Sequence, residues 1–142
     1  MTIAAILGGK GHGVIHLGPG STVREAAELL SEKRIGCVPI IENGQVIGIV
    51  SERDVVRCVG QSGAAVLGEP VSTVMTSPAV TIEPGLPVMS ALSLMTRRRI
   101  RHLPVIDGGK MVGFVSIGDL VKYRIDKIEA EAAAMREYIQ SS

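Results

Sequence analysis

Apolar and polar residues follow the same pattern in two stretches of the chain, and this pattern predicts two amphipathic helices. Apolar side chains recur there at i, i+3, i+4 and i+7, the spacing that gives a helix one buried face. The positions are Val23, Ala26, Ala27 and Leu30 in the first stretch and Val88, Ala91, Leu92 and Met95 in the second. Thr22 followed by Glu25 is a capping-box signal at the start of the first helix.

Short β-branched runs flank both predicted helices and predict strands. The runs cover 14–17, 38–41 and 45–50 in the first stretch and 79–82, 103–106 and 110–115 in the second. Pro-Gly pairs follow the first run of each stretch and predict turns, whereas Asn43-Gly44 and Gly108-Gly109 predict tight hairpins. Ser51 and Ser116 then occupy the position of a helix N-cap, with Asp54 and Asp119 in the first turn.

The two stretches are copies of one unit. Residues 14–57 align with 79–122 without a gap at an offset of 65, and 15 of the 44 paired positions are identical. Each unit has the order strand, helix, strand, strand, helix, and a unit of about 45 residues buries too little surface to be stable alone. We therefore expect an α/β (α+β) fold in which two β-α-β-β-α repeats pack about a pseudo-two-fold axis. The expected boundaries are 1–60 for the first repeat, 61–70 for a linker, 71–124 for the second repeat and 125–142 for a C-terminal helical extension.

A heptad stripe continues beyond the second repeat and predicts a long helix that pairs with another helix. Its apolar residues are Val121, Ile125, Ile128, Ala132, Met135 and Ile139. A second copy of the chain is the expected partner, which gives a homodimer. The alternative is that this helix folds back on its own domain.

Composition limits the remaining possibilities. The net charge of +1 gives no general attraction to a polyanion, so nucleic-acid binding is not expected. Two cysteines and three scattered histidines provide neither a disulfide framework nor metal-ligand spacing, which suits a reducing cytoplasm. We find no membrane span or leader, and no catalytic constellation, so we expect a cytoplasmic protein that is not an enzyme. The run Gly8–Gly13 is interpreted as a flexible connector, because a strand and not a helix follows it.

Two corresponding segments carry a resemblance to a known family. The first combines residues 38–41 and 48–54, and the second combines 103–106 and 113–119 and is preceded by Val74-Met75-Thr76. The chain resembles a tandem pair of CBS domains, the module named after cystathionine β-synthase and called a Bateman module when paired. The resemblance covers about residues 3–122 and leaves no room for an enzyme domain. It therefore indicates the stand-alone regulatory type.

The resemblance implies ligands that carry adenosine, such as AMP, ADP, ATP, NAD(H) or S-adenosylmethionine, in two clefts between the repeats, and no required cofactor. It assigns sugar and phosphate contacts to a Ser and an Asp in each copy, phosphate contacts to basic residues before the strand proline, and the adenine edge to the end of the first strand. In this chain these residues are Ser51, Asp54, Ser116, Asp119, Arg101, His102, Thr81 and Ile82. Because Gly36 and Cys37 replace the basic pair in the first copy, we expect the second copy to prefer the more anionic ligand.

The same residue types also have an ordinary structural explanation. Ser and Asp are preferred at helix starts without any ligand, although a helix N-terminus also attracts phosphate. Arg53 is a further phosphate candidate, and its alternative is an exposed first-turn residue. Arg97 and Arg98 are interpreted as solvated cations at a helix C-terminus.

The leading functional hypothesis is a regulatory module that senses an adenine nucleotide and signals to an unidentified partner protein. The alternative is a structural or interaction protein with unoccupied clefts that acts through its C-terminal helix. Nucleic-acid binding through the Arg97 to Arg101 cluster ranks last, because Phe114, Tyr123 and Tyr138 are the only aromatic residues.

Overall fold

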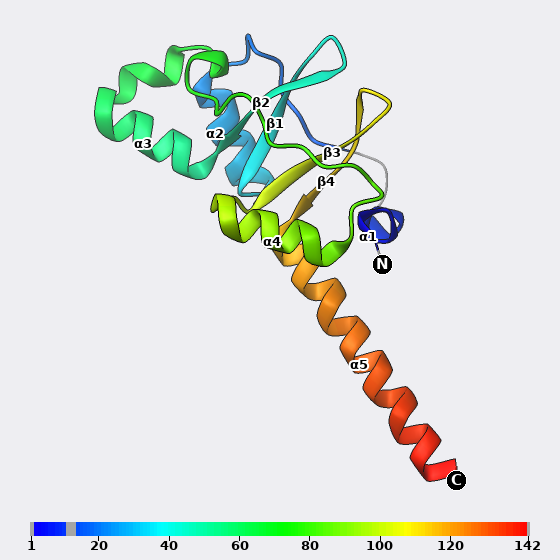
Figure 1. Ribbon diagram of the computed structural model, residues 1–142. Helices are drawn as coiled ribbons and strands as arrows, with labels where there is room; N and C mark the ends of the chain where they lie inside the picture. Colours follow the sequence, from blue (N-terminus) through cyan, green and yellow to red (C-terminus); the bar gives the residue numbers. More distant parts are fainter. Residues whose placement is uncertain (1, 11–13, 142) are drawn as a thin grey trace.

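The computed structural model describes residues 2–10 and 14–141 and contains two small antiparallel sheets with helices packed around them (Figure 1). The elements are α1 (Ile3–Lys10), α2 (Val23–Lys33), β1 (Cys37–Glu42), β2 (Gln45–Ser51), α3 (Glu52–Ser62), the 3-10 helices η1 (Ala64–Gly68) and η2 (Val71–Thr73), α4 (Val88–Arg98), β3 (His102–Asp107), β4 (Lys110–Ser116) and α5 (Ile117–Ser141). The mixed helix and strand fold with a C-terminal helix is as expected.

Both hairpins form as expected from their turn residues. β1 pairs with β2 and β3 with β4, each antiparallel. Asn43 and Gly44 have φ of 53° and 79°, and Gly108 and Gly109 have φ of 60° and 80°. Positive φ at both central residues is the requirement of the type I′ turn, which matches the twist of the two strands.

The predicted first strand of each repeat is wrong as a strand and is reduced to a single bridge. The Leu17 N–H donates to the Pro39 carbonyl oxygen at 3.1 Å, and the Ile41 N–H donates to the Leu17 carbonyl oxygen at 2.8 Å. Ile82 bridges to Val105 in the same way. Residues 14–16 and 79–81 have no strand partner, and the Pro-Gly turn at 19–20 or 84–85 redirects the chain after the bridge.

The helix ends follow the local signals. The Thr22 hydroxyl accepts from the Glu25 N–H at 3.1 Å, and Ser51 forms a full capping box with Asp54 at the start of α3. α2 and α4 both end on an arginine in the left-handed conformation, Arg34 with φ of 54° and Arg99 with φ of 55°. Glycine is the usual residue at such a position. Each repeat has an arginine there instead, although the helix end itself does not need its side chain.

The segment before each repeat packs against the other repeat. Ile3 and Ile6 of α1 are buried in the core of the second repeat, with Met95, Leu103 and others. Val71, in the segment before the second repeat, is buried in the core of the first. The expected units 1–60 and 71–124 therefore do not correspond to two separately packed bodies. The offset of 65 identifies which segments of the sequence are copies. It does not identify which segments pack together, because α1 and Val71 each pack on the other copy.

Two glycines allow these crossing segments to approach the sheets. A Cβ at Gly48 would lie 2.5 Å from the Met75 Sδ and 3.0 Å from the Thr76 carbonyl oxygen. A Cβ at Gly113 would collide with the side chain of Leu7. Leu7 of α1 thus takes the place on the second repeat that Met75 takes on the first.

Two predicted connecting segments are folded. α3 extends to Ser62, and η1 follows with Val66 buried, so the segment 61–70 links the repeats as helix and not as an open chain. Gly8 to Lys10 belong to α1, so the interpretation of the glycine run as a flexible connector is wrong for these residues. Residues 11–13 of that run lie outside the described residues.

α5 projects away from the body of the molecule as a rod (Figure 1). Residues 129–141 are exposed along their whole length, so the alternative in which the helix folds back on its own domain is wrong. Over residues 2–10 and 14–141, no helix combines the length and apolar character that crossing a membrane requires.

Candidate functional site

Two cavities open between the repeats, each named here by the aspartate at its wall. The Asp54 cleft has a volume of about 690 Å³ and combines the start of α3 with the segments 76–80 and 99–102. The Asp119 cleft has a volume of about 370 Å³ and combines β4 and the start of α5 with 14–15 and 34–37. Both volumes fall within the roughly 300–1,000 Å³ of small-molecule sites.

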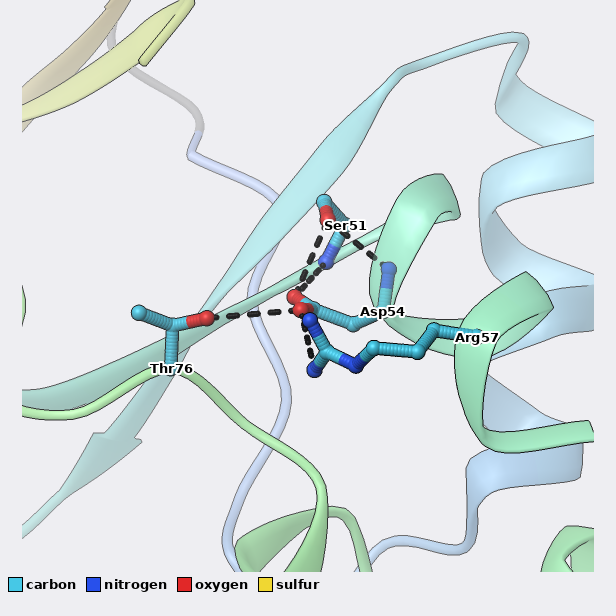
Figure 2. A network of polar contacts seen from close by, with 4 residues as sticks. All are labelled: Ser51, Asp54, Arg57 and Thr76. Carbon is cyan, nitrogen blue, oxygen red and sulfur yellow. Dashed lines mark hydrogen bonds and ion pairs between the residues drawn. The ribbon is translucent and has the colours of Figure 1, made fainter. Parts of the chain in front are cut away.

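The Asp54 carboxylate is the centre of a polar network (Figure 2). Its Oδ2 accepts from the Ser51 N–H at 2.8 Å and from the Ser51 hydroxyl at 2.9 Å. Its Oδ1 accepts from Arg57 Nη2 at 3.0 Å and from the Thr76 hydroxyl at 3.3 Å. Thr76 reaches this network from the segment that joins the two repeats, whereas Ser51, Asp54 and Arg57 lie at the start of α3.

Burial of the Asp54 carboxylate costs free energy unless the group has hydrogen-bond or ion-pair partners. Asp54 is 4% exposed, and it is the only charged residue buried among those described. A desolvated carboxylate needs an ion pair and hydrogen bonds to remain charged. Arg57 and the start of α3 supply such partners to Asp54 at the wall of the cavity.

Cations surround the Asp54 cleft. Arg53, Arg57, Arg99 and Arg101 line it, together with His102. Arg99, the left-handed residue at the end of α4, is among these lining residues. Four arginines around one cavity give a site suited to an anion, because guanidinium groups bind phosphate oxygens in pairs.

The apolar part of the Asp54 cleft comes from residues that are not the expected ones. Ile49, Val56, Pro78, Ala79, Val80 and Ile100 line it. Thr81 and Ile82, which we expected at the adenine edge, are absent from the lining of both clefts. Ile82 is 6% exposed and lies in the core of the second repeat, because its backbone pairing with Val105 turns the side chain inward. The contact of Thr81 and Ile82 with the adenine therefore stays a prediction.

The Asp119 cleft is smaller and has fewer charged residues in its lining. The Ser116 N–H donates to the Asp119 Oδ2 at 2.8 Å, and the Asp119 N–H donates to the Ser116 hydroxyl oxygen at 3.1 Å. Leu7 enters this cleft from α1, and the Phe114 ring stacks on His102 with ring centroids 5.8 Å apart. Arg34 is the arginine in its lining.

Each cleft combines residues of both repeats, which corrects the expected grouping. Arg101 lines the Asp54 cleft and not the Asp119 cleft, and His102 lies between the two and lines both. The cation-rich site therefore contains Ser51 and Asp54 of the first copy. The physical reason is the pseudo-two-fold packing, which places the strand entry of one repeat against the helix start of the other.

A family profile described as "CBS domain" matches residues 11–60 and 71–126. The chain belongs to the CBS-domain family. It is 32% identical over 123 residues to the CBS domain-containing protein YhcV of Bacillus subtilis (strain 168), and the match covers 84% of this chain and 85% of that protein. The expected tandem pair of CBS repeats is thereby confirmed.

Solved structures show the same CBS pair architecture. The crystal structure of the CBS-domain containing protein ATU1752 from Agrobacterium tumefaciens matches with a TM-score of 0.83 at 38% identity, covering 87% of this chain and 99% of that one. The structure of CBSX2 in complex with AMP matches with a TM-score of 0.75 at 23% identity, covering 88% and 96%. At that lower identity the likeness shows the fold alone.

Cys37 lies in the wall shared by both CBS clefts, and its thiol has low reactivity. Burial, and secondarily the charge of Asp54, raises the pKa of the Cys37 thiol to about 12. The thiol is therefore protonated at neutral pH and is a poor nucleophile. Among the described residues, no group of three or more His, Cys, Asp or Glu side chains could hold a metal ion.

Several residues of the CBS clefts were missed by sequence reasoning. Arg57 had a usable signal, because it lies one helical turn after Asp54. Leu7 had a weaker signal, because Ile6-Leu7 resembles Val74-Met75. These pairs are 68 residues apart and not 65, so the gapless alignment of the repeats does not match them. Thr76 was noted only as part of Val74-Met75-Thr76, which gave no sign of its contact with Asp54, because that contact joins segments 22 residues apart.

Proposed function

We propose that this CBS pair is a regulatory module that binds an adenine nucleotide in the Asp54 cleft and signals to a partner protein. One observation carries the proposal: a buried carboxylate and four arginines line the same cavity. A carboxylate accepts hydrogen bonds from vicinal ribose hydroxyls, and guanidinium groups bind phosphate. The AMP complex of CBSX2, a structure of the same fold, supports this class of ligand.

In the proposed complex the two ends of the nucleotide meet different parts of the cleft. Asp54 takes the ribose, Arg99 and Arg101 with Arg53 take the phosphate, and the apolar residues Val56, Ala79 and Val80 take the adenine. The Asp119 cleft, with less volume and Arg34 as its lining arginine, takes a less anionic adenosine compound, with Ser116 and Asp119 at the sugar. The complex of MJ0100 with 5′-methylthioadenosine and S-adenosyl-L-methionine, also of this fold, is consistent with such ligands.

The direct test is calorimetric titration with AMP, ADP, ATP, NAD(H) and adenosine. We expect AMP to bind at least tenfold more tightly than adenosine, because a charged phosphate contact contributes about 1.5–3 kcal/mol. Arg101→Ala should weaken AMP binding about tenfold and leave the affinity for adenosine unchanged. Arg97→Ala is the matched control, because Arg97 belongs to the same basic cluster but does not line the cleft. Equal binding of AMP and adenosine would contradict the phosphate assignment, and no binding by the whole panel would contradict the proposed function.

Ribose binding requires a rearrangement of the Asp54 network. A carboxylate offers about four acceptor positions, and four donors already occupy them. The Thr76 hydroxyl makes the longest of these hydrogen bonds, so it is the donor that a ribose hydroxyl displaces most easily. Because Thr76 lies on the segment between the repeats, its displacement would transmit ligand binding to their relative position.

Thr76→Val should therefore raise the affinity for AMP by roughly two- to fivefold, since a competing hydrogen bond worth about 0.5–1 kcal/mol is removed. The measurement is the same calorimetric titration. Ser77→Ala is the control, because the Ser77 hydroxyl donates to the Ile47 carbonyl oxygen and not to Asp54. A lower affinity of Thr76→Val would show that Thr76 assists the ligand instead of competing with it.

A further inference from the structure

α5 carries an exposed apolar stripe that its own fold does not cover. Ile125, Ile128 and Met135 are 49%, 47% and 59% exposed. α3, the equivalent helix of the first repeat, ends at Ser62, which corresponds to residue 127 at the repeat offset of 65. The overhang beyond residue 127 therefore belongs to no part of the CBS fold, and about 20 Å of helix at 1.5 Å per residue is presented to solvent.

The stripe has the geometry of a coiled-coil seam. With Ile125 at heptad position a, the a positions are Ile125, Ala132 and Ile139 and the d positions are Val121, Ile128 and Met135. The flanking g positions are Arg124, Glu131 and Tyr138, and the e positions are Lys122, Glu129 and Arg136.

The flanking charges match in a parallel pair. In a parallel, in-register dimer each g residue faces the e residue five positions later on the other helix. Arg124 then faces the partner's Glu129, and Glu131 faces the partner's Arg136. Both charged g-to-e contacts join opposite charges, and the two-fold symmetry makes each of them twice.

The same charges oppose an antiparallel pair. Aligning the stripe with its reverse places Ile128 against the partner's Ala132, and e then faces e and g faces g. Glu129 would face the partner's Glu129, and Glu131 would face the partner's Glu131. Lys122 would face the partner's Arg136, so every charged contact would be repulsive.

We propose that residues 121–139 of α5 pair with the same segment of a second copy in a parallel, in-register two-stranded coiled coil. This interface is independent of whether the clefts bind a nucleotide. Parallel pairing places both CBS bodies at the same end of the rod. Because α5 begins at Ile117, beside Asp119 in the smaller cleft, one continuous helix runs from that cleft to the dimer seam.

Charge reversals in the full chain test both the partner and its orientation, with the dimer dissociation constant measured by sedimentation equilibrium. Glu131→Arg places a second cation against the partner's Arg136 at two symmetric sites, and we expect the dissociation constant to rise roughly tenfold at low salt. Arg136→Glu should have a similar effect. The double variant, which exchanges the two charges, should return the constant to within about twofold of the parent. Glu137→Arg, at the outward f position, is the control with the same charge change and should have no effect.

The outcomes separate the alternatives. In an antiparallel pair Glu131→Arg exchanges one like-charge contact for another and changes little, while Arg136→Glu strengthens the dimer by facing the partner's Lys122. That result would overturn the orientation. A monomeric parent, or a dimer that none of these variants affects, would overturn the interface itself. The substituted residues Glu131, Arg136 and Glu137 lie in the exposed segment 129–141 of α5, away from the body of the protein. Circular dichroism checks that the helix content of each variant is unchanged.

Discussion

Asp54→Asn is expected to weaken AMP binding by ten- to a hundredfold. The carboxylate can accept two charge-assisted hydrogen bonds from the ribose hydroxyls, which together contribute about 1.5–3 kcal/mol. Asparagine keeps the size and one acceptor oxygen, so the capping contact with the Ser51 N–H can persist. The measurements are the AMP dissociation constant by calorimetry and the melting temperature of each variant.

A second ligand and a neighbouring carboxylate make this prediction specific. 2′-Deoxy-AMP should bind the parent poorly and lose little more in Asp54→Asn, because one of the two hydroxyl contacts is already missing. Glu52→Gln is the matched control, since Glu52 also lines the cleft but is exposed at its rim. If Asp54 serves only as a structural residue, its replacement lowers the melting temperature, because its hydrogen bonds and its ion pair with Arg57 are weakened, and leaves AMP affinity unchanged. That outcome would remove the ribose assignment. The same pair of measurements on Asp119→Ala tests the sugar contact in the smaller cleft.

Truncation after Arg124 is expected to convert a dimer into a monomer or a much weaker dimer. The truncated chain loses Ile125, Ile128, Ala132, Met135 and Ile139, which are all of the stripe except Val121. Sedimentation velocity over a range of concentrations measures the change. Residues 129–141 are exposed along their whole length, so the melting temperature of the monomeric unit should change little.

A shorter truncation after Ile139 keeps the whole stripe and should leave the dimer intact. This control separates the loss of the seam from the general effect of shortening the chain. A dimer that persists unchanged after truncation at Arg124 would place the main interface on the repeats. Exposed Val56 of α3 and Met89 of α4, at 71% and 60%, are then the apolar positions to substitute next.

Local patterns predicted most elements of the fold. The apolar spacing at Val23 and Val88 specified the faces of α2 and α4, and both residues are buried. Turn residues such as Asn43-Gly44 specified the hairpins, because few conformations suit these types. The strands expected at 14–17 and 79–82 failed, since strand formation depends on a neighbour, and only Leu17 and Ile82 find one.

The candidate site was predicted in its residue types but not in its grouping. Asp54 and Ser51 were identified from a motif of seven residues, in which local hydrogen bonding alone brings the two side chains together. Arg101 was identified as a phosphate candidate, but its place opposite Asp54 depends on the contact between repeats. Ala79 and Val80 replaced Thr81 and Ile82, because the first segment of each copy forms one bridge and no strand.

The sequence by itself determined the repeat, the helix caps, the hairpin turns and the heptad stripe of α5. Each of these arises from interactions between residues a few positions apart, where spacing and residue type are sufficient. The tertiary structure alone decided that α1 packs on the second repeat, that Thr76 contacts Asp54, and that the arginines of one copy line a cleft with the aspartate of the other. These contacts join segments whose separation along the chain carries no periodic signal, so they follow only from how the two repeats pack.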